Sequence, residues 1–368
     1  MSNGLIELPN WSEPDPDDAR IESLVANLAR EDGPADAAGS WPEGLWRLLV
    51  EAGATRWSLT RDSGGQPCSR PLLVERYARL ASGSLTAVFI LSQHDAAVRR
   101  LSGAASREEA RRWLEAIGPG QAFTTVGISQ LTTSRRLGTQ ALLATETGPG
   151  TYRLQGAMPW VTGACRADVF VTGALLEDGR QMLIALPANR PGVTVQPAFE
   201  LAALQASCTA EVTLDDVIVT DSDLLAIPSL ELSDQPGAVA AAGLETSALA
   251  MGQARAALAA LVTMAEDRIE LNDPVDVLCE TWAQTWSALM ACARGDESSV
   301  TPSQVRAQAN ALVLRTTQAY LAARRGSGFL RSEPAQRWAR QALFFLVWSC
   351  PMPVAQAAIR NLAGLCPG

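Results

Sequence analysis

Lysine is absent from this sequence, and all 30 of its basic residues are arginine. Lysine forms Schiff bases with carbonyl substrates and holds phosphates in P-loop nucleotidases and protein kinases. Its absence therefore excludes all three mechanisms. Histidine is nearly absent as well, since His94 is the only one, and the seven cysteines contain no Cys-x-x-Cys pair. Zinc and iron sites are commonly built from such residues, so we expect no metal centre.

Positive charge is in deficit, and the net charge is −9. Nucleic acids and anionic membrane surfaces attract proteins with a positive field, so we expect neither as a partner. The odd number of cysteines suits reduced thiols and a cytoplasmic location. Residues 1–10 have no basic region and no apolar run, which predicts no signal peptide. The uncharged stretch 341–359 contains Pro351 and Pro353, so we expect no membrane-spanning helix there.

The 368 residues are 47% hydrophobic, which suffices for more than one packed region. The hydrophobic period is helical from about 17 to 118, close to two in the middle of the chain, and helical again towards the end. We predict a mainly α fold with a central β domain: an N-terminal helical domain (1–118), a small antiparallel, barrel-like β domain (119–226) and a C-terminal four-helix bundle (227–368). The expected strands are 151–156, 169–172, 180–185, 193–195 and 210–214, and the expected bundle helices lie near 238–268, 275–294, 302–325 and 334–348. The Asp/Pro-rich segment 13–18 is expected to be a frayed leader.

One segment of the β region carries a recognisable pattern. Residues 152–164 read Tyr-Arg-Leu-Gln-Gly-Ala-Met-Pro-Trp-Val-Thr-Gly-Ala, and Ala-Asp-Val-Phe follows at 167–170. These two segments, and the order of a helical region, a β domain and a helical bundle along the chain, resemble the acyl-CoA dehydrogenase superfamily. In that family the Trp lies beside the flavin ring and the Thr hydroxyl bonds to it, so the resemblance implies bound FAD against Trp160 and Thr162. A flavin needs such a platform and donors aimed at its ring, whereas the plainer alternative is that Trp160 is a core aromatic.

The phosphates of FAD require positive charge, and here arginine must supply it. Arg268 stands near the end of the first predicted bundle helix, where the family has an Arg that reaches the FAD of a neighbouring subunit. The resemblance therefore implies a homodimer, or a tetramer of two such dimers. An Arg that binds the carboxyl end of its own helix is the alternative. Gly326 and Gly328 resemble the family's glycine-rich turn near the FAD adenosine.

Oxidation of an acyl thioester at its α and β carbons requires a carboxylate that removes the α proton. By alignment, Ser349 occupies the usual position of this base in the family. The isovaleryl and long-chain types carry a Glu on the first bundle helix instead, and Glu245 has that spacing. It is also the only acidic residue between Asp234 and Glu266. We predict Glu245 as the base, and the alternative is a Glu on the solvent-facing side of its helix.

The hydroxyl-rich segment 125–134 stands where the family has a Thr that contacts flavin and a Ser near the thioester. The family motif itself is altered there, with Ser129 in the place of the Thr and Ser134 in the place of the Ser. Three hypotheses follow. The first is an FAD-dependent acyl-CoA dehydrogenase that oxidises an acyl thioester and passes electrons to an acceptor the sequence does not identify. The second is a flavin-dependent monooxygenase or oxidase of the same fold, and the third is a degenerate scaffold without flavin.

Overall fold

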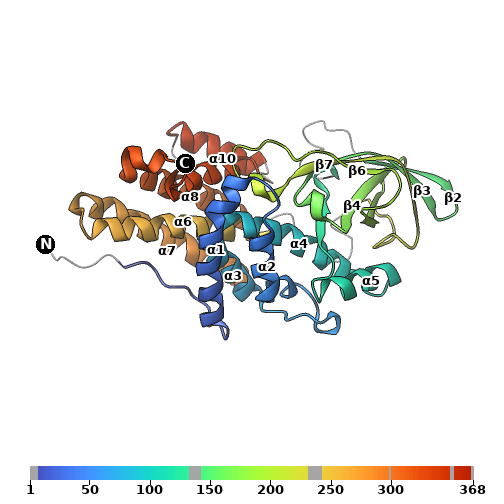
Figure 1. Cartoon of the computed structure of the whole chain (residues 1–368), viewed down its shortest axis with the longest axis horizontal. Helices are drawn as coiled ribbons and strands as arrows, with labels where there is room; N and C mark the ends of the chain where they lie inside the picture. Colours follow the sequence, from blue (N-terminus) through green and yellow to red (C-terminus); the bar gives the residue numbers. More distant parts are fainter. Residues whose placement is uncertain (1–6, 132–141, 231–242, 298–299, 349–351, 366–368) are drawn as a thin grey trace.

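Most helices lie at one end of the molecule and the sheet at the other, and the helix Glu108–Ile117 lies beside the sheet (Figure 1). The computed structural model describes residues 7–131, 142–230, 243–297, 300–348 and 352–365. The N-terminal helices are α1 (Asp18–Ala38), α2 (Glu43–Glu51), α3 (Arg70–Gly83), α4 (Leu85–Gly103) and α5 (Glu108–Ile117).

A serine cap fixes the start of α4 and ties it to α1. The Ser84 hydroxyl accepts a hydrogen bond from the Ala87 amide (3.1 Å) and donates one to Asp32 of α1 (2.6 Å). Such a cap satisfies an amide that the first turn of a helix leaves unpaired. The position of α4 is therefore set at its first residue, and the helix then runs through the interior with most of its side chains buried.

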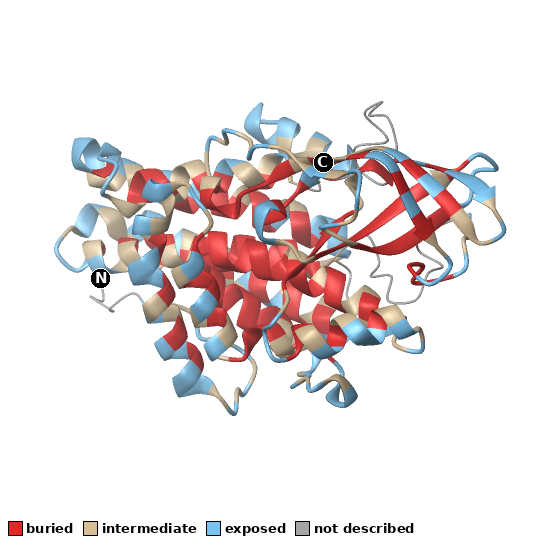
Figure 2. Ribbon diagram, turned by 45° about the vertical axis from the view of Figure 1, so that its right-hand side comes forward, coloured by how far each residue is buried: buried red, intermediate tan, exposed pale blue. Residues whose placement is uncertain are grey.

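The C-terminal helices are α6 (Leu244–Ala265), α7 (Asn272–Arg294), α8 (Pro302–Arg324), α9 (Pro334–Ala342) and α10 (Met352–Leu362). By length and composition α6 could cross a membrane, but 61% of its most apolar window is buried against other helices, as in the core of a globular protein. Figure 2 shows buried residues concentrated where the helices pack together and along the sheet.

The last predicted helix is divided in the structure. The expected helix 334–348 ends at Ala342, and a 3-10 turn (Leu343–Leu346) replaces its continuation. In this region Phe344 and Trp348 stack at 5.0 Å, and Phe89 of α4 packs edge-on against both rings. Packing of these rings against α4 accompanies the turn, and α10 is an additional helix that the sequence did not predict.

The sheet is mixed, which corrects the prediction of a purely antiparallel domain. Its strands are β1 (Thr124–Gly127), β2 (Leu143–Gly148), β3 (Thr151–Val161), β4 (Val169–Leu176), β5 (Gln181–Pro187), β6 (Val193–Val195) and β7 (Ala210–Thr220). The order is β1-β4-β2-β3-β7-β6, with β5 also paired to β4. β4 runs parallel to both β1 and β2, and the other pairs are antiparallel. Neither β1 nor β2 was predicted, because β1 is buried throughout and β2 is mostly exposed, so neither shows a clean period of two.

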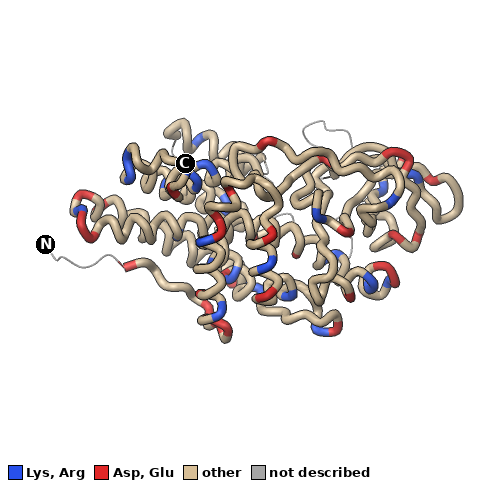
Figure 3. The backbone as a smooth tube through the Cα atoms, in the orientation of Figure 1, with Lys and Arg blue, Asp and Glu red and all other residues tan. Residues whose placement is uncertain are grey.

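Ion pairs hold the C-terminal helices to α1. Arg337 and Arg340 of α9 reach Asp32 (2.8 Å) and Asp36 (2.7 Å) of α1. Figure 3 shows that basic and acidic residues lie close together in several places along the chain. Arginine therefore contributes here to joining elements that are far apart in the sequence.

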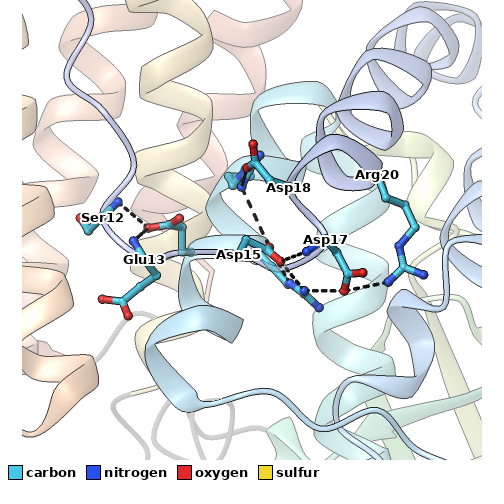
Figure 4. A network of polar contacts seen from close by, with 9 residues as sticks. Ser12, Glu13, Asp15, Asp17, Asp18 and Arg20 are labelled. Carbon is cyan, nitrogen blue, oxygen red and sulfur yellow. Dashed lines mark hydrogen bonds and ion pairs between the residues drawn. The ribbon is translucent and has the colours of Figure 1, made fainter.

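The Asp/Pro-rich N-terminal segment is bound to α3, so the prediction of a frayed leader is wrong (Figure 4). The amides of Ser12 and Glu13 donate to the Glu75 carboxylate at 2.7 and 2.9 Å. Arg76 binds Asp15 through Nε and Nη2 at 2.8 and 2.6 Å, and it also reaches Asp17. Acidic side chains that look like a solvated leader in sequence are thus the partners of a buried arginine.

Candidate functional site

The end of β3 presents an exposed aromatic surface. Trp160 is 53% exposed and its ring lies 4.7 Å from that of Phe199. The alternative that Trp160 is a core aromatic is therefore wrong. Two residues further on, Thr162 is buried, and its hydroxyl is 3.3 Å from that of Thr209. The strand end thus combines an apolar face with a hydroxyl pair beneath it.

Two further hydroxyl groups at this strand end have no hydrogen-bond partner among the described residues. They are Oγ1 of Thr125 and Oγ of Ser129, and both atoms are buried. Their segment lies directly on β3, because a Cβ placed at Gly127 would come within 2.9 Å of Met158 Sδ. Sequence reasoning selected Ser129 but missed Thr125, although both belong to the hydroxyl-rich segment. Ser134, the predicted substrate contact, lies outside the described residues.

These residues fit a flavin. A buried hydroxyl without a partner is costly, and a polar ligand edge would remove that cost. Trp160 and Phe199 offer an aromatic face on which a flat ring can pack. The close approach at Gly127 brings the two kinds of contact to the same strand end.

Glu245 lies in the first turn of α6 and forms an ion pair with an arginine of α4. Its Oε1 is 3.3 Å from Nη2 of Arg99, and the two side chains are 20% and 23% exposed. The carboxylate is therefore mostly buried and has a charged partner. The ion pair holds the Glu245 carboxylate in a fixed position at the start of α6.

Two buried polar residues, Asp95 and Tyr77, lie near Arg99. Asp95 precedes Arg99 by one turn of α4 and accepts a hydrogen bond from the hydroxyl of Tyr77. Burial raises the pKa of Asp95 to about 7, although the Arg99 charge opposes this. The pKa of Tyr77 is raised by burial and by Asp95. The sequence prediction missed this cluster, whose signal was the spacing of four between Asp95 and Arg99 on a helix that begins with the mostly apolar run 85–91.

Helix α4 contacts both Glu245, through Arg99, and strand β1, which carries Thr125. His94 Nδ1 donates to the carbonyl of Thr124 in β1 at 3.0 Å. Arg99 is five residues further along α4, which corresponds to about 7.5 Å of helix axis. Val98 of α4 belongs to the same hydrophobic cluster as Val126 of β1. The predicted base and the segment that carries the hydroxyls of 125–129 thus both adjoin α4.

The predicted phosphate-side residues form a separate group at the end of α8. Arg268 donates to Glu270 (2.8 Å) and to the carbonyl of Ala323 in α8 (2.8 Å), so it binds the carboxyl end of a neighbouring helix and not of its own. Gly326 and Gly328 lie in the 3-10 turn (Arg325–Phe329) that follows α8. Within the described ranges no hydrogen bond joins this group to Trp160 or Glu245. A role towards a neighbouring subunit stays a prediction.

No family model matches the chain, but curated proteins and solved structures do. Benzylmalonyl-CoA dehydrogenase of Aromatoleum aromaticum is 28% identical over 70% of this chain and 67% of its own length. The "Probable acyl-CoA dehydrogenase YngJ" of Bacillus subtilis is 25% identical over 65% of this chain and 64% of its own length, so the match spans less than two thirds of that relative.

Two structures with different activities share the fold. Butyryl-CoA dehydrogenase of Megasphaera elsdenii superposes with a TM-score of 0.75 at 16% identity, over 96% of this chain and 100% of the other. Dibenzothiophene monooxygenase of Paenibacillus sp. A11-2 superposes with a TM-score of 0.76 at 19% identity, over 94% and 95%. At these identities the likeness shows the fold alone. The curated relatives and the shared fold together indicate similarity to the acyl-CoA dehydrogenase superfamily.

Proposed function

We propose that the protein is an FAD-dependent dehydrogenase that oxidises an acyl thioester between its α and β carbons. The observation that carries this proposal is the strand end at Trp160, where an exposed aromatic face adjoins two buried hydroxyls that have no partner in the described part of the chain. The names of the curated relatives support a thioester substrate.

The residues of the site have two roles, which are to bind FAD and to accept a proton from the substrate. FAD, when bound, supplies the acceptor for a hydride from the β carbon. Trp160 would hold the ring and shield it from water, and Thr125, Ser129 and Thr162 would offer hydroxyls to it. Glu245 accepts the α proton as the base.

Arg99 is a positioning residue for that base. Its guanidinium fixes the ionised Glu245 at the start of α6 at 3.3 Å. The pair would thereby orient the carboxylate for proton transfer.

The remaining partners are extensions of this proposal. Arg268, Gly326 and Gly328 would serve FAD across a subunit interface, in a homodimer or a tetramer of two dimers. Ser134 would contact the thioester side of the substrate. Electrons would leave to an acceptor that stays unidentified, and the enzyme would act in the cytoplasm.

The second candidate is a flavin-dependent monooxygenase or oxidase. The likeness to dibenzothiophene monooxygenase favours it. In such an enzyme the carboxylate has no acyl proton to remove. A flavin-free scaffold is the third candidate.

Two measurements separate these candidates. The visible spectrum of the purified protein, before and after incubation with FAD, should show bound flavin, and a preparation that stays colourless would favour the scaffold. Incubation with an acyl-CoA series should then give the α,β-unsaturated thioester without oxygen if an artificial electron acceptor is present. An oxygen-dependent product, with no unsaturated thioester, would favour the monooxygenase or oxidase.

A further inference from the structure

Two cysteines meet just beyond the candidate flavin platform, in a place that the proposed function does not use. Cys165 lies in the 3-10 turn (Ala164–Arg166) three residues after Thr162. Cys208 directly follows the turn Gln205–Ser207. The two turns adjoin, because the Gly163 amide donates to the Ser207 carbonyl at 2.8 Å.

The two thiols act on each other across these adjoining turns. The interaction with the Cys208 thiol, together with the charge of Arg166, outweighs burial and lowers the pKa of Cys165 to about 7. The same interaction and burial raise the pKa of Cys208 far above its ordinary value. Cys165 is therefore the sulfur that ionises near neutral pH, and Cys208 is the one that keeps its proton.

The two sulfurs also differ in their exposure to solvent, and Cys165 is the more exposed residue. Cys165 is exposed and lines an open pocket of about 670 Å³ with Asn189, Gln196 and Ala198. Cys208 is only 6% exposed. Its backbone has a φ of 47°, which is uncommon for a residue other than glycine. One sulfur is thus open to small molecules, and the other is held beneath it.

We propose that Cys165 and Cys208 form a redox-active dithiol that hydroperoxides convert to a disulfide. The Cys165 thiolate attacks one peroxide oxygen, the O–O bond breaks, and the leaving hydroxide takes a proton to become water. Cys208 then attacks the sulfenic sulfur of Cys165, the S–O bond breaks, and the oxygen leaves as water with the Cys208 proton. The two thiols lose two hydrogens in total and one hydrogen peroxide becomes two waters.

The test titrates the full-length protein, as purified, with hydrogen peroxide and measures its intact mass. The wild type should lose about 2 Da and show a cross-link between the peptides that carry Cys165 and Cys208, which dithiothreitol reverses. Cys208→Ser should lose no mass, and its Cys165 should instead be labelled by dimedone as sulfenic acid. Cys68→Ser is the matched control and should behave as the wild type, because burial raises the pKa of Cys68 to about 11.

A second readout depends on neither activity nor flavin. The rate of iodoacetamide alkylation at Cys165 should have its midpoint near pH 7, and Cys208→Ala, which leaves no donor beside Cys165, should move it up by more than one pH unit. A cross-link through other cysteines, a Cys165 oxidised while Cys208 stays a free thiol in the wild type, or an unchanged midpoint in Cys208→Ala would overturn the proposal.

Discussion

At the scale of single residues, the hydroxyl of Thr125 tests whether this strand end binds flavin or is only a packed part of the sheet. This hydroxyl is buried and bonds to none of the residues that the structure describes, so Thr125→Val should leave the protein without FAD as stable as the wild type or slightly more so. If the flavin edge binds this hydroxyl, the same change should weaken FAD binding about 5–30-fold, which is about 1–2 kcal/mol.

Thr316→Val is the matched control for Thr125→Val. Thr316 is also buried, but its hydroxyl bonds to the carbonyl of Leu312 within α8. Titration of FAD by fluorescence gives both affinities. Equal dissociation constants for wild type and Thr125→Val would remove Thr125 from the flavin site.

Asp95 makes the stability of the protein depend on pH. Its pKa is raised from 3.8 to about 7 by burial, with Tyr77, Arg99 and Glu245 as the groups that face it. A raised pKa means that the folded state holds the proton more tightly, so this stabilisation is fully present below about pH 4 and lost by about pH 7.

Asp95→Asn should remove that dependence and keep an acceptor for the Tyr77 hydroxyl. Relative to the wild type, the free energy of unfolding of the variant should rise between pH 4 and pH 7 by on the order of 2–4 kcal/mol. Urea unfolding at several pH values measures it. The exposed Asp62→Asn is the control, and a constant difference between wild type and Asp95→Asn over this range would refute the assignment.

At the scale of elements, the N-terminal segment is held to α3 by one arginine and its acids. Burial acts to raise the pKa of Asp15, but hydrogen bonds from Arg76 and from the backbone outweigh it and lower the pKa. Asp15 therefore stabilises the fold above its unfolded-state pKa, and that contribution is lost as the pH falls through the folded-state pKa.

Asp15→Asn should cost about 1–3 kcal/mol of unfolding free energy at pH 7, since the buried Arg76 loses a charged partner. Asp18→Asn is the matched control and should cost less than about 1 kcal/mol, because Asp18 is 60% exposed although it pairs with Arg79. Chemical denaturation compares them. Equal losses in the two variants would mean that the segment adds nothing through Asp15.

The elements also show what the sequence could and could not predict. The order of helical and β regions and the strands that contain 151–156, 169–172 and 210–214 were predictable, because their hydrophobic periods are clear. β1, β2 and the split after Ala342 were not, since they depend on partners distant in sequence. At the site, Trp160 and Glu245 could be predicted from the sequence around them. The pairing of Glu245 with Arg99 and the burial of the Thr125 hydroxyl could not, because they depend on how α4 packs against α6 and β1.

At the scale of the whole molecule, the C-terminal helices leave large apolar side chains exposed. Phe329, Val347 and Ile359 are 78%, 74% and 67% exposed. Together with the placement of Arg268 beside the turn 325–329, this favours the proposed homodimer or tetramer. Light scattering at micromolar concentration should give a dimer or larger, and a monomer that retains flavin would contradict it.

Flavin binding should also raise the stability of the entire chain. FAD at 100 times its dissociation constant should add about 2.7 kcal/mol to the free energy of unfolding. Thermal unfolding with and without FAD measures this, with riboflavin as a control that lacks the phosphates. No shift with FAD would argue against a cofactor site at Trp160.

The central claim is that Glu245 removes the α proton while flavin accepts the hydride. Stopped-flow measurement of flavin reduction by an acyl-CoA substrate, without oxygen, tests it most directly. Glu245→Gln should keep the fold and the bound flavin but reduce this rate about 10²–10⁴-fold. Glu266→Gln, at the exposed far end of α6, should leave the rate unchanged. A full reduction rate in Glu245→Gln would contradict the claim.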